Sequence, residues 1–224
     1  MTPDEFRAET GVSRETLARF EVFHALLLKW QARINLIGPS TRDDIWRRHF
    51  FDSAQLYPLL PPPKAADTPQ VLADLGSGAG FPGLVLALMA SGECRPLATN
   101  LIESDQRKAA FLIEAVGTFS LGDSVTIHNR RVESLGGDLL RRVDIVTARA
   151  LADLPLLLVW SAPLLRRSGV CLFLKGTSAS DELTLAHKVW KMRAEMLPSR
   201  SDPSGTVLRL GDISRCQTPQ NQLT

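Results

Sequence analysis

The feature that most constrains the fold is a glycine-rich turn that follows a short apolar segment. Residues 71–75 have the length and composition of a buried strand, and glycines follow at positions 76, 78 and 80. Glycine reaches backbone angles that other residues avoid, and it lets a ligand lie against the main chain. A helical stretch begins directly afterwards, and the first N–H groups of a helix have no partner within it. This order predicts a ligand site at the carboxyl end of the first strand of an open α/β sheet.

Strand and helix patterns alternate from this turn onward. Short apolar runs are followed by longer stretches whose apolar residues recur every three or four positions. We predict further strands over 97–102, 125–127, 143–147, 170–174, 195–198 and 206–210, and helices over 81–90, 105–119, 154–165 and 179–192. The alternation predicts an α/β fold with a mostly parallel sheet covered by helices on both faces.

The N-terminal region has a different pattern. Ser13 is placed to cap a helix over 13–36, and Thr41 with Asp44 resembles a capping pair for a second helix over 42–57. Five prolines between residues 58 and 69 end this helical region. We therefore predict three parts, which are a helical N-terminal cap with a proline-rich linker (1–66), an α/β domain (67–216) and a frayed tail (217–224).

The bulk composition excludes several classes of protein. No run approaches the roughly 18 apolar residues of a membrane helix, and the acidic N-terminus lacks the apolar core of a secretion signal. The three cysteines and four histidines are scattered, so we expect no disulfide framework and no metal site. A reduced, cytoplasmic location is the expectation. The net charge of +2 permits a nucleic-acid partner only through a local basic surface.

Residues around the turn favour one type of ligand. Gly78 to Gly83 fit G-x-G-x-x-G, which alone is a weak signal for a dinucleotide. Asp74 would repel a pyrophosphate and attract a cationic methionine moiety, and Pro82 removes an N–H that a pyrophosphate would use. Glu103, at the end of the second predicted strand, can accept hydrogen bonds from both ribose hydroxyls. These residues favour S-adenosylmethionine (SAM), with Asp74 orienting the turn or the amino acid part of SAM through water.

The run Asp-Leu-Gly-Ser-Gly-Ala-Gly-Phe-Pro-Gly at 74–83 resembles the first motif of class I SAM methyltransferases. With other segments it resembles one family, the bacterial 16S ribosomal RNA guanine-N7 methyltransferases, also called glucose-inhibited division protein B. Those segments are Leu28-Lys29-Trp30, Ile34-Asn35-Leu36, Arg48-His49, Asp52-Ser53, Lys108-Ala109-Ala110-Phe111-Leu112, Arg131-Val132-Glu133, Thr147-Ala148-Arg149-Ala150 and Leu174-Lys175-Gly176. The resemblance runs in the family's order from about residue 20 to residue 176, and little family signal follows.

The resemblance implies a Rossmann-like methyltransferase fold with a seven-stranded, mostly parallel sheet and a small helical N-terminal cap. It implies SAM as the cofactor and a guanine of small-subunit ribosomal RNA as the substrate. Together with the turn, it predicts cofactor contacts from Asp74, Gly76, Gly78, Phe81, Glu103, Val132, Glu133 and Arg149.

Methyl transfer to guanine N7 needs no general base, because N7 of neutral guanine already carries a lone pair. The barrier falls mainly through positioning. Consistent with this, the chain has no Pro-Cys pair and no Asp/Asn-Pro-Pro-aromatic tetrad. We expect Arg149 to position the guanine or the donor, by pairing with the O6 edge or by stacking. An ion pair with a nearby acid such as Asp144 is the structural alternative.

Basic residues on the cap and beside the site are expected to contact RNA phosphates, which supply affinity without sequence choice. The predicted contacts are Lys29, Arg47, Arg48, His49, Arg131 and Lys175, with Arg33, Arg130, Arg141 and Arg142 as further candidates. His49 is equally compatible with packing against a helix. The low net charge favours a structured, assembled ribosomal particle that is recognised by shape.

Three alternatives stay open at this point. A methyltransferase with another RNA substrate would share the SAM site. A nucleotide-binding oxidoreductase would bind a nicotinamide dinucleotide and not SAM. A SAM-binding sensor would bind SAM and leave RNA unmodified.

Overall fold

The computed structural model describes residues 1–63, 68–135, 137 and 139–216. The predicted boundary between residues 66 and 67 and the predicted tail 217–224 lie outside the described residues. Among the described residues, no helix combines the length and the apolar character that crossing a membrane requires.

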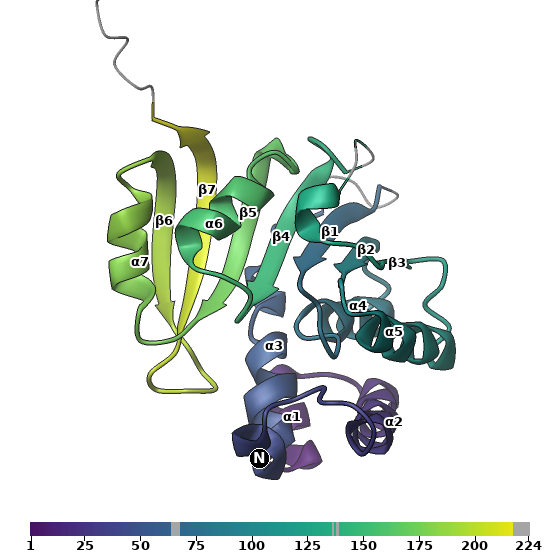
Figure 1. Cartoon of the computed structure of the whole chain (residues 1–224). Coiled ribbons are helices and arrows are strands. Elements are labelled where there is room, and N and C mark those ends of the chain that lie inside the picture. The colour runs from purple at the N-terminus through teal and green to yellow at the C-terminus, as the bar shows by residue number, and fades with distance from the viewer. Residues whose placement is uncertain (64–67, 136, 138, 217–224) are drawn as a thin grey trace, which may run out of the picture.

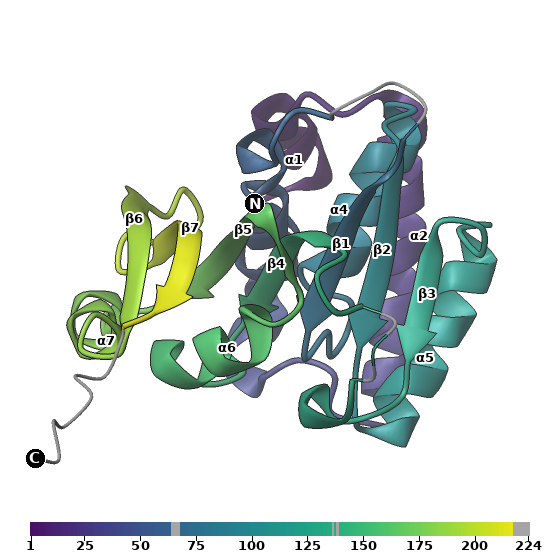
Figure 2. The same cartoon turned by 90° about the horizontal axis from the view of Figure 1, so that it is seen from above.

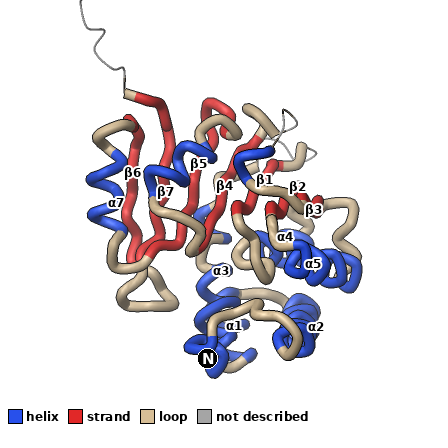
Figure 3. The backbone as a smooth tube through the Cα atoms, in the orientation of Figure 1, coloured by secondary structure: helices blue, strands red, loops and turns tan. Residues whose placement is uncertain are grey.

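The centre of the molecule is a seven-stranded sheet in the order β3-β2-β1-β4-β5-β7-β6, with only β7 antiparallel to its neighbours (Figures 1 and 3). Its parallel core joins β1 to β2 and β4, for example through Leu72 opposite both Thr99 and Ile145. The strands are β1 (Gln70–Leu75), β2 (Leu97–Ile102), β3 (Val125–His128), β4 (Val143–Arg149), β5 (Leu165–Lys175), β6 (Trp190–Pro198) and β7 (Thr206–Arg215).

Helices cover both faces of the sheet, as predicted (Figure 2). One face packs against α4 (Gly83–Gly92) and α5 (Gln106–Thr118). The opposite face packs against α6 (Leu154–Ser161) and α7 (Ala179–Ala186). The strands between these layers are covered on both sides, and β1 and β4 are therefore buried along almost their whole length, including the polar residues Asp74, Asp144 and Thr147.

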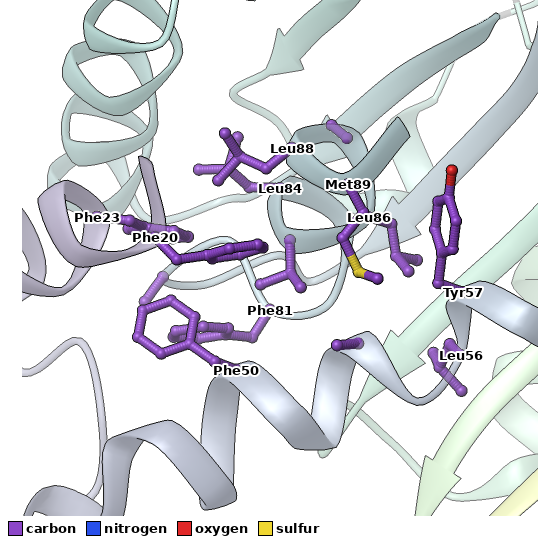
Figure 4. Close-up of a cluster of buried hydrophobic side chains, with 14 of the residues drawn as sticks. Phe20, Phe23, Phe50, Leu56, Tyr57, Phe81, Leu84, Leu86, Leu88 and Met89 are labelled. Atoms are coloured by element: carbon purple, nitrogen blue, oxygen red, sulfur yellow. The ribbon is translucent and has the colours of Figure 1, made fainter. Parts of the chain in front are cut away.

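The N-terminal cap packs on the α4 and α5 side and shares their apolar core. Phe23 stacks on Phe81 with ring centroids 5.6 Å apart, and Phe50 meets both rings edge to face. Figure 4 shows Phe20, Phe23 and Phe50 gathered against Phe81 and Leu84. The described elements of the cap are α1 (Pro3–Thr10), α2 (Arg14–Gln31), the 3-10 helices η1 (Pro39–Asp44) and η3 (Tyr57–Leu59), the π-helical η2 (Trp46–Phe51) and α3 (Asp52–Ala54).

Two predictions for the cap are wrong in detail. The helix predicted over 13–36 ends at Gln31, because the Gln31 side-chain oxygen accepts the backbone N–H groups of Leu36 and Ile37 and holds the chain in a turn. The single helix predicted over 42–57 is a series of short helical turns that begins at Pro39. Thr41 does not cap it, since its hydroxyl donates to the Gly38 carbonyl.

Helix ends were also overestimated in the second half of the chain. α6 ends at Ser161, two residues before Pro163, and Leu165 already begins β5. α7 ends at Ala186, and Trp190, which was predicted to be helical, begins β6. Trp190 is buried and pairs with Arg215 of β7, so sheet pairing over 190–198 overrides the helical pattern.

Asn100 lies inside β2, where a polar side chain is costly unless it is paired. Its amide donates to the Leu72 carbonyl, and its side-chain oxygen lies 2.9 Å from Nε2 of His128. The side chain of Asn100 is therefore hydrogen-bonded by both neighbouring strands, β1 and β3.

Candidate active site

The glycine turn has the geometry that its sequence predicts. Gly76, Gly78 and Gly80 all have positive φ, at 69°, 56° and 85°. A Cβ at Gly76 would lie 2.6 Å from Cδ1 of Leu151, whereas a Cβ at Gly78 would have only the Gly76 carbonyl oxygen within 4 Å. The main chain at Gly78 is therefore open on the side where a ligand can lie against it.

Asp74 is fully buried directly beneath this turn. One carboxylate oxygen accepts the Thr147 hydroxyl at 2.7 Å, and the other accepts the backbone N–H of Gly83 at 3.0 Å. Asp74 thus orients the start of α4 through direct hydrogen bonds, and a water-mediated contact with SAM stays a prediction. Burial raises the pKa of Asp74 to about 6, against the opposing effect of hydrogen bonds from Thr147, Ser77 and Gly83.

Glu103 links the end of β2 to the turn. Its carboxylate accepts the backbone N–H of Gly78 at 2.8 Å and that of Asp105 at 2.7 Å. Each carboxylate oxygen has a second lone pair, so these bonds leave acceptor capacity for a ribose hydroxyl. Ribose binding by Glu103 stays a prediction.

Arg149, the last residue of β4, is held between the cap and the turn. Its guanidinium donates to the Arg48 carbonyl at 3.0 Å and to Nδ1 of His49 at 2.8 Å, and it lies 3.5 Å from the Asp52 carboxylate. Its carbon Cζ is 5.1 Å from the centroid of the Phe81 ring, a cation–π distance. Burial lowers the pKa of Arg149, while Asp52 opposes this effect.

Asp144 is not the partner of Arg149. Its carboxylate instead accepts the backbone N–H of Val71 and pairs with Arg166. Asp144 is near the start of β4 and five residues before Arg149, so the two side chains lie at opposite ends of the strand and on opposite faces of the sheet.

A cavity of about 790 Å³ opens where β1, β4 and β5 end, on the side of the cap. In Figure 1 the arrowheads of β1 and β4 point toward the cap. The cavity brings together predicted residues from four parts of the chain, namely Gly76, Gly78, Phe81, Arg48, His49, Arg149 and Lys175. Within the described residues, its lining does not include Val132, Glu133 or Arg131. Val132 and Glu133 lie in η4 (Val132–Ser134), after β3, and Arg131 directly precedes it, so their predicted roles stay predictions.

Most of the basic residues predicted to contact RNA are already engaged within the protein. Lys29 pairs with Glu114 at 3.1 Å, and Arg47 lies 3.6 Å from Asp44. Arg48 forms an ion pair with Asp202. Each of these three cations therefore already has an acidic partner.

The side chains of His49 and Lys175 are buried within the protein and are not exposed to solvent at its surface. Nε2 of His49 lies 2.7 Å from the Thr41 hydroxyl, and its ring packs 5.0 Å from that of Phe81. Burial, followed by the charges of Arg149 and Arg48, lowers the pKa of His49 to about 3, so the ring is neutral. Lys175 donates to the Ala152 carbonyl at 2.6 Å and pairs with Glu182 at 2.7 Å. The structure therefore favours the packing role for His49, and it places Lys175 inside the cavity wall.

Sequence reasoning missed several residues that shape the site. Thr147 holds Asp74, Asp52 approaches Arg149, and Asp202 pairs with Arg48. Thr147 and Asp52 lie within segments that carried the family resemblance. The resemblance therefore marked these positions, but it did not indicate what either side chain does. Asp202 lies beyond Gly176, after the last of the segments on which the resemblance was based.

Solved structures of low sequence identity share this fold. A SAM dependent methyltransferase from Aquifex aeolicus is similar with a TM-score of 0.56 and 14% identity, over 78% of this chain and 98% of that one. A putative S-adenosyl-L-methionine-dependent methyltransferase from Methanococcus maripaludis is similar with a TM-score of 0.55 and 11% identity, over 80% and 93%. The sheet order and the glycine turn at the end of β1 thus define a class I methyltransferase fold.

The family follows from sequence comparison. Residues 16–202 match the GidB family model, described as rRNA small subunit methyltransferase G. The chain is 52% identical to the ribosomal RNA small subunit methyltransferase G of Rhodospirillum centenum over 94% of this chain and 90% of that protein, and 50% identical to that of Rhodospirillum rubrum over 96% and 100%. The chain therefore belongs to the GidB family of small-subunit rRNA methyltransferases. This confirms the predicted family, fold class, enzyme class and use of SAM.

Proposed function

We propose that this chain transfers the methyl group of SAM to N7 of one guanine in 16S ribosomal RNA, within the cavity between the cap and the ends of β1, β4 and β5. The observation that carries the proposal is the position of Arg149, which lines this cavity beside the glycine turn and contacts residues of the cap. Family membership supports the RNA substrate.

The residues of the turn fit SAM. The main chain at Gly78 is open, and the carboxylates of Asp74 and Glu103 lie beneath and beside it. Gly76, Gly78 and Phe81 would hold the methionine side, and Glu103 the ribose. When bound, SAM supplies an electrophilic methyl group on a sulfonium. The negative charge near the turn favours that cation over a pyrophosphate, which disfavours the oxidoreductase alternative.

The histidine and the carboxylates in the described lining of the cavity all make contacts within the protein. Asp52 accepts the Ser201 hydroxyl and lies against Arg149, and Asp153 accepts the backbone N–H of Leu156. Both ring nitrogens of His49 are occupied by Arg149 and Thr41. Asp202 pairs with Arg48, and Glu182 pairs with Lys175. This arrangement suits N7 of guanine, which attacks through a lone pair and loses no proton. The contribution of the protein is then orientation and exclusion of water.

Arg149 is the residue we assign to positioning. A neutral His49 accepts a hydrogen bond from one edge of the guanidinium, and the Phe81 ring lies at cation–π distance, so the charge is held at one place in the cavity. An arginine held in this way can pair with O6 of guanine and leave N7 free.

The test compares 16S rRNA from the source bacterium with and without an intact gene, by primer extension after cleavage specific for N7-methylguanosine. We expect one cleavage stop in the intact strain and its absence in the deletion strain. Restoration by the cloned gene checks that the loss is due to this chain. An identical pattern in both strains would overturn the proposed function.

We further propose that the substrate is a small ribosomal particle in the cytoplasm rather than free RNA. With a net charge of +2, and with Lys29, Arg47 and Arg48 engaged by acids, the protein lacks the extended basic surface that tight binding of unstructured RNA requires. Recognition by shape is the remaining way to gain specificity. Unmethylated particles and protein-free 16S rRNA from the deletion strain are to be compared as substrates, and equal or faster methylation of the free RNA would contradict this proposal.

A further inference from the structure

A second hollow of about 360 Å³ lies beside the cavity. It is formed by the turn after α2, residues 31–35, and by the first residues of α5 with their cap, Asp105. Lys108 lines both this hollow and the cavity of the active site. The two spaces therefore adjoin.

The hollow is rich in positive charge. Arg33, Arg107 and Lys108 line it, against the single carboxylate of Asp105. That carboxylate is occupied by the backbone N–H groups of Arg107 and Lys108, which lower its pKa. The ion pairs among the described residues include none of the three cations. Their charge contrasts with that of Lys29, Arg48 and Lys175, which are neutralised within the protein.

The wall between the hollow and the cavity is a fixed segment of chain. Residues 32–35 face the hollow, and Leu36, Ile37 and Gly38 line the cavity. The side chain of Gln31 holds this segment through three hydrogen bonds, accepting from the N–H groups of Leu36 and Ile37 and donating to the Ile37 carbonyl. These hydrogen bonds fix the segment that separates the hollow from the active-site cavity.

We propose that this hollow binds a phosphodiester of the RNA strand next to the target guanine. This inference rests on the proposed function. A base can enter a protein cavity only when its nucleotide is turned out of the stack, which brings the adjoining backbone against the rim. SAM carries no phosphate, and its one anionic group is the methionine carboxylate, so the methyl donor does not account for three unpaired cations. Arg33 and Arg107 present forked donors suited to phosphate oxygens, and Lys108 lies at the boundary between phosphate and base.

The test uses the double variant Arg33→Gln/Arg107→Gln, which leaves Lys108 and the cavity intact. The substrate is unmethylated small ribosomal particles from the deletion strain. Charged hydrogen bonds contribute enough that the KM for particles should rise roughly 10- to 100-fold at low salt. The slope of log K against log salt should become shallower by about 1 to 2. The rate at saturating particle concentration and the affinity for SAM should stay near those of the wild type.

A matched control removes the same charge elsewhere. Arg14 and Arg167 are exposed, and Arg14 begins α2 at the end opposite to the hollow. The variant Arg14→Gln/Arg167→Gln should keep the wild-type KM and salt slope, and Arg33→Lys/Arg107→Lys should recover most of the particle affinity. All three double variants are compared with the wild type by thermal unfolding, so that a loss of folding is detected.

Several results would overturn the inference. An unchanged KM and salt slope in Arg33→Gln/Arg107→Gln would show that no phosphate binds there. An equal effect in the control would reduce the role of the hollow to net charge, and a comparable loss of SAM affinity would assign it to the cofactor. Wild-type enzyme that fails to methylate guanine N7 would instead refute the proposed function, so the two failures are distinguishable.

Discussion

At the scale of single residues, Arg149 connects the end of β4 to the cap. Replacing it with lysine keeps the charge, but a single ammonium cannot satisfy the Arg48 carbonyl, His49 and Asp52 in the same geometry. We expect Arg149→Lys to lower kcat/KM for particles by roughly 10- to 100-fold, because positioning is the main source of rate. Initial rates of methyl transfer measure the effect.

Arg166→Lys is the control for this variant. Arg166 pairs with Asp144 near the amino end of β4, remote from the cavity. The initial rate of methyl transfer by Arg166→Lys should therefore be close to that of the wild type. Full activity in Arg149→Lys and also in Arg149→Ala would remove Arg149 from the positioning role.

The buried carboxyl of Asp74 makes stability depend on pH. Burial raises its pKa from 3.8 to about 6. Because the folded state holds the proton more tightly than the unfolded state, this group stabilises the fold below pH 3.8, and the contribution is lost as the pH rises through 6. The difference corresponds to about 3 kcal/mol at 1.36 kcal/mol per pH unit.

The variant Asp74→Asn isolates this effect, since asparagine does not titrate. The free energy of unfolding of the wild type minus that of the variant should fall by up to about 3 kcal/mol between pH 4 and pH 7. Urea unfolding at several pH values measures it. A difference that stays constant over this range would show that the pKa of Asp74 is unchanged by folding.

At the scale of elements, the start of α4 packs too closely against the sheet for any side chain larger than glycine at position 83. A Cβ at Gly83 would lie 2.6 Å from both Cβ of Asp74 and Cδ2 of Leu101. We expect Gly83→Ala to lower the free energy of unfolding by about 1–3 kcal/mol through overpacking. Denaturant unfolding measures the change.

Gly117 supplies the matched control within α5. It is exposed, and a Cβ there would meet no other atom within 4 Å. Gly117→Ala should therefore raise the free energy of unfolding by about 0.5–1 kcal/mol, as expected for a helical position. Equal effects of the two substitutions would contradict the packing argument for α4.

At the scale of the whole molecule, the cap and the α/β layers share one apolar core. Phe23 of α2 packs against Phe50 of the cap. It also packs against Phe81, Phe111 and Phe119, which belong to the α/β part of the molecule. We expect Phe23→Ala to lower the free energy of unfolding by about 3–5 kcal/mol, with the cap and the sheet still unfolding in a single transition. Circular dichroism and tryptophan fluorescence during unfolding measure this.

Leu28→Ala on the same helix is the control, because Leu28 is 46% exposed. Its effect should stay within about 0.5 kcal/mol. Two separate transitions in the wild type or in Phe23→Ala would show that the cap is an independent unit.

The sequence by itself determined the features that depend on local geometry. The glycine turn after residue 75 requires a positive φ at three positions, and glycine adopts a positive φ without steric strain. The alternation of strands and helices likewise determined the parallel core of the sheet, because each strand there is buried on both faces. These local rules, together with the family resemblance of residues 74–83, identified the cofactor and the enzyme class.

Only the tertiary structure decided which charged side chains are free. Lys175 and Arg48 look like phosphate contacts in the sequence, but Glu182 and Asp202 lie beside them in the fold. His49 is neutral because it is buried against Phe81 and Arg149, residues distant in the chain. Burial and pairing depend on contacts between remote segments, and no local pattern encodes them. The same physical reason explains why the cationic hollow beside the site became visible only when α2 and α5 were placed together.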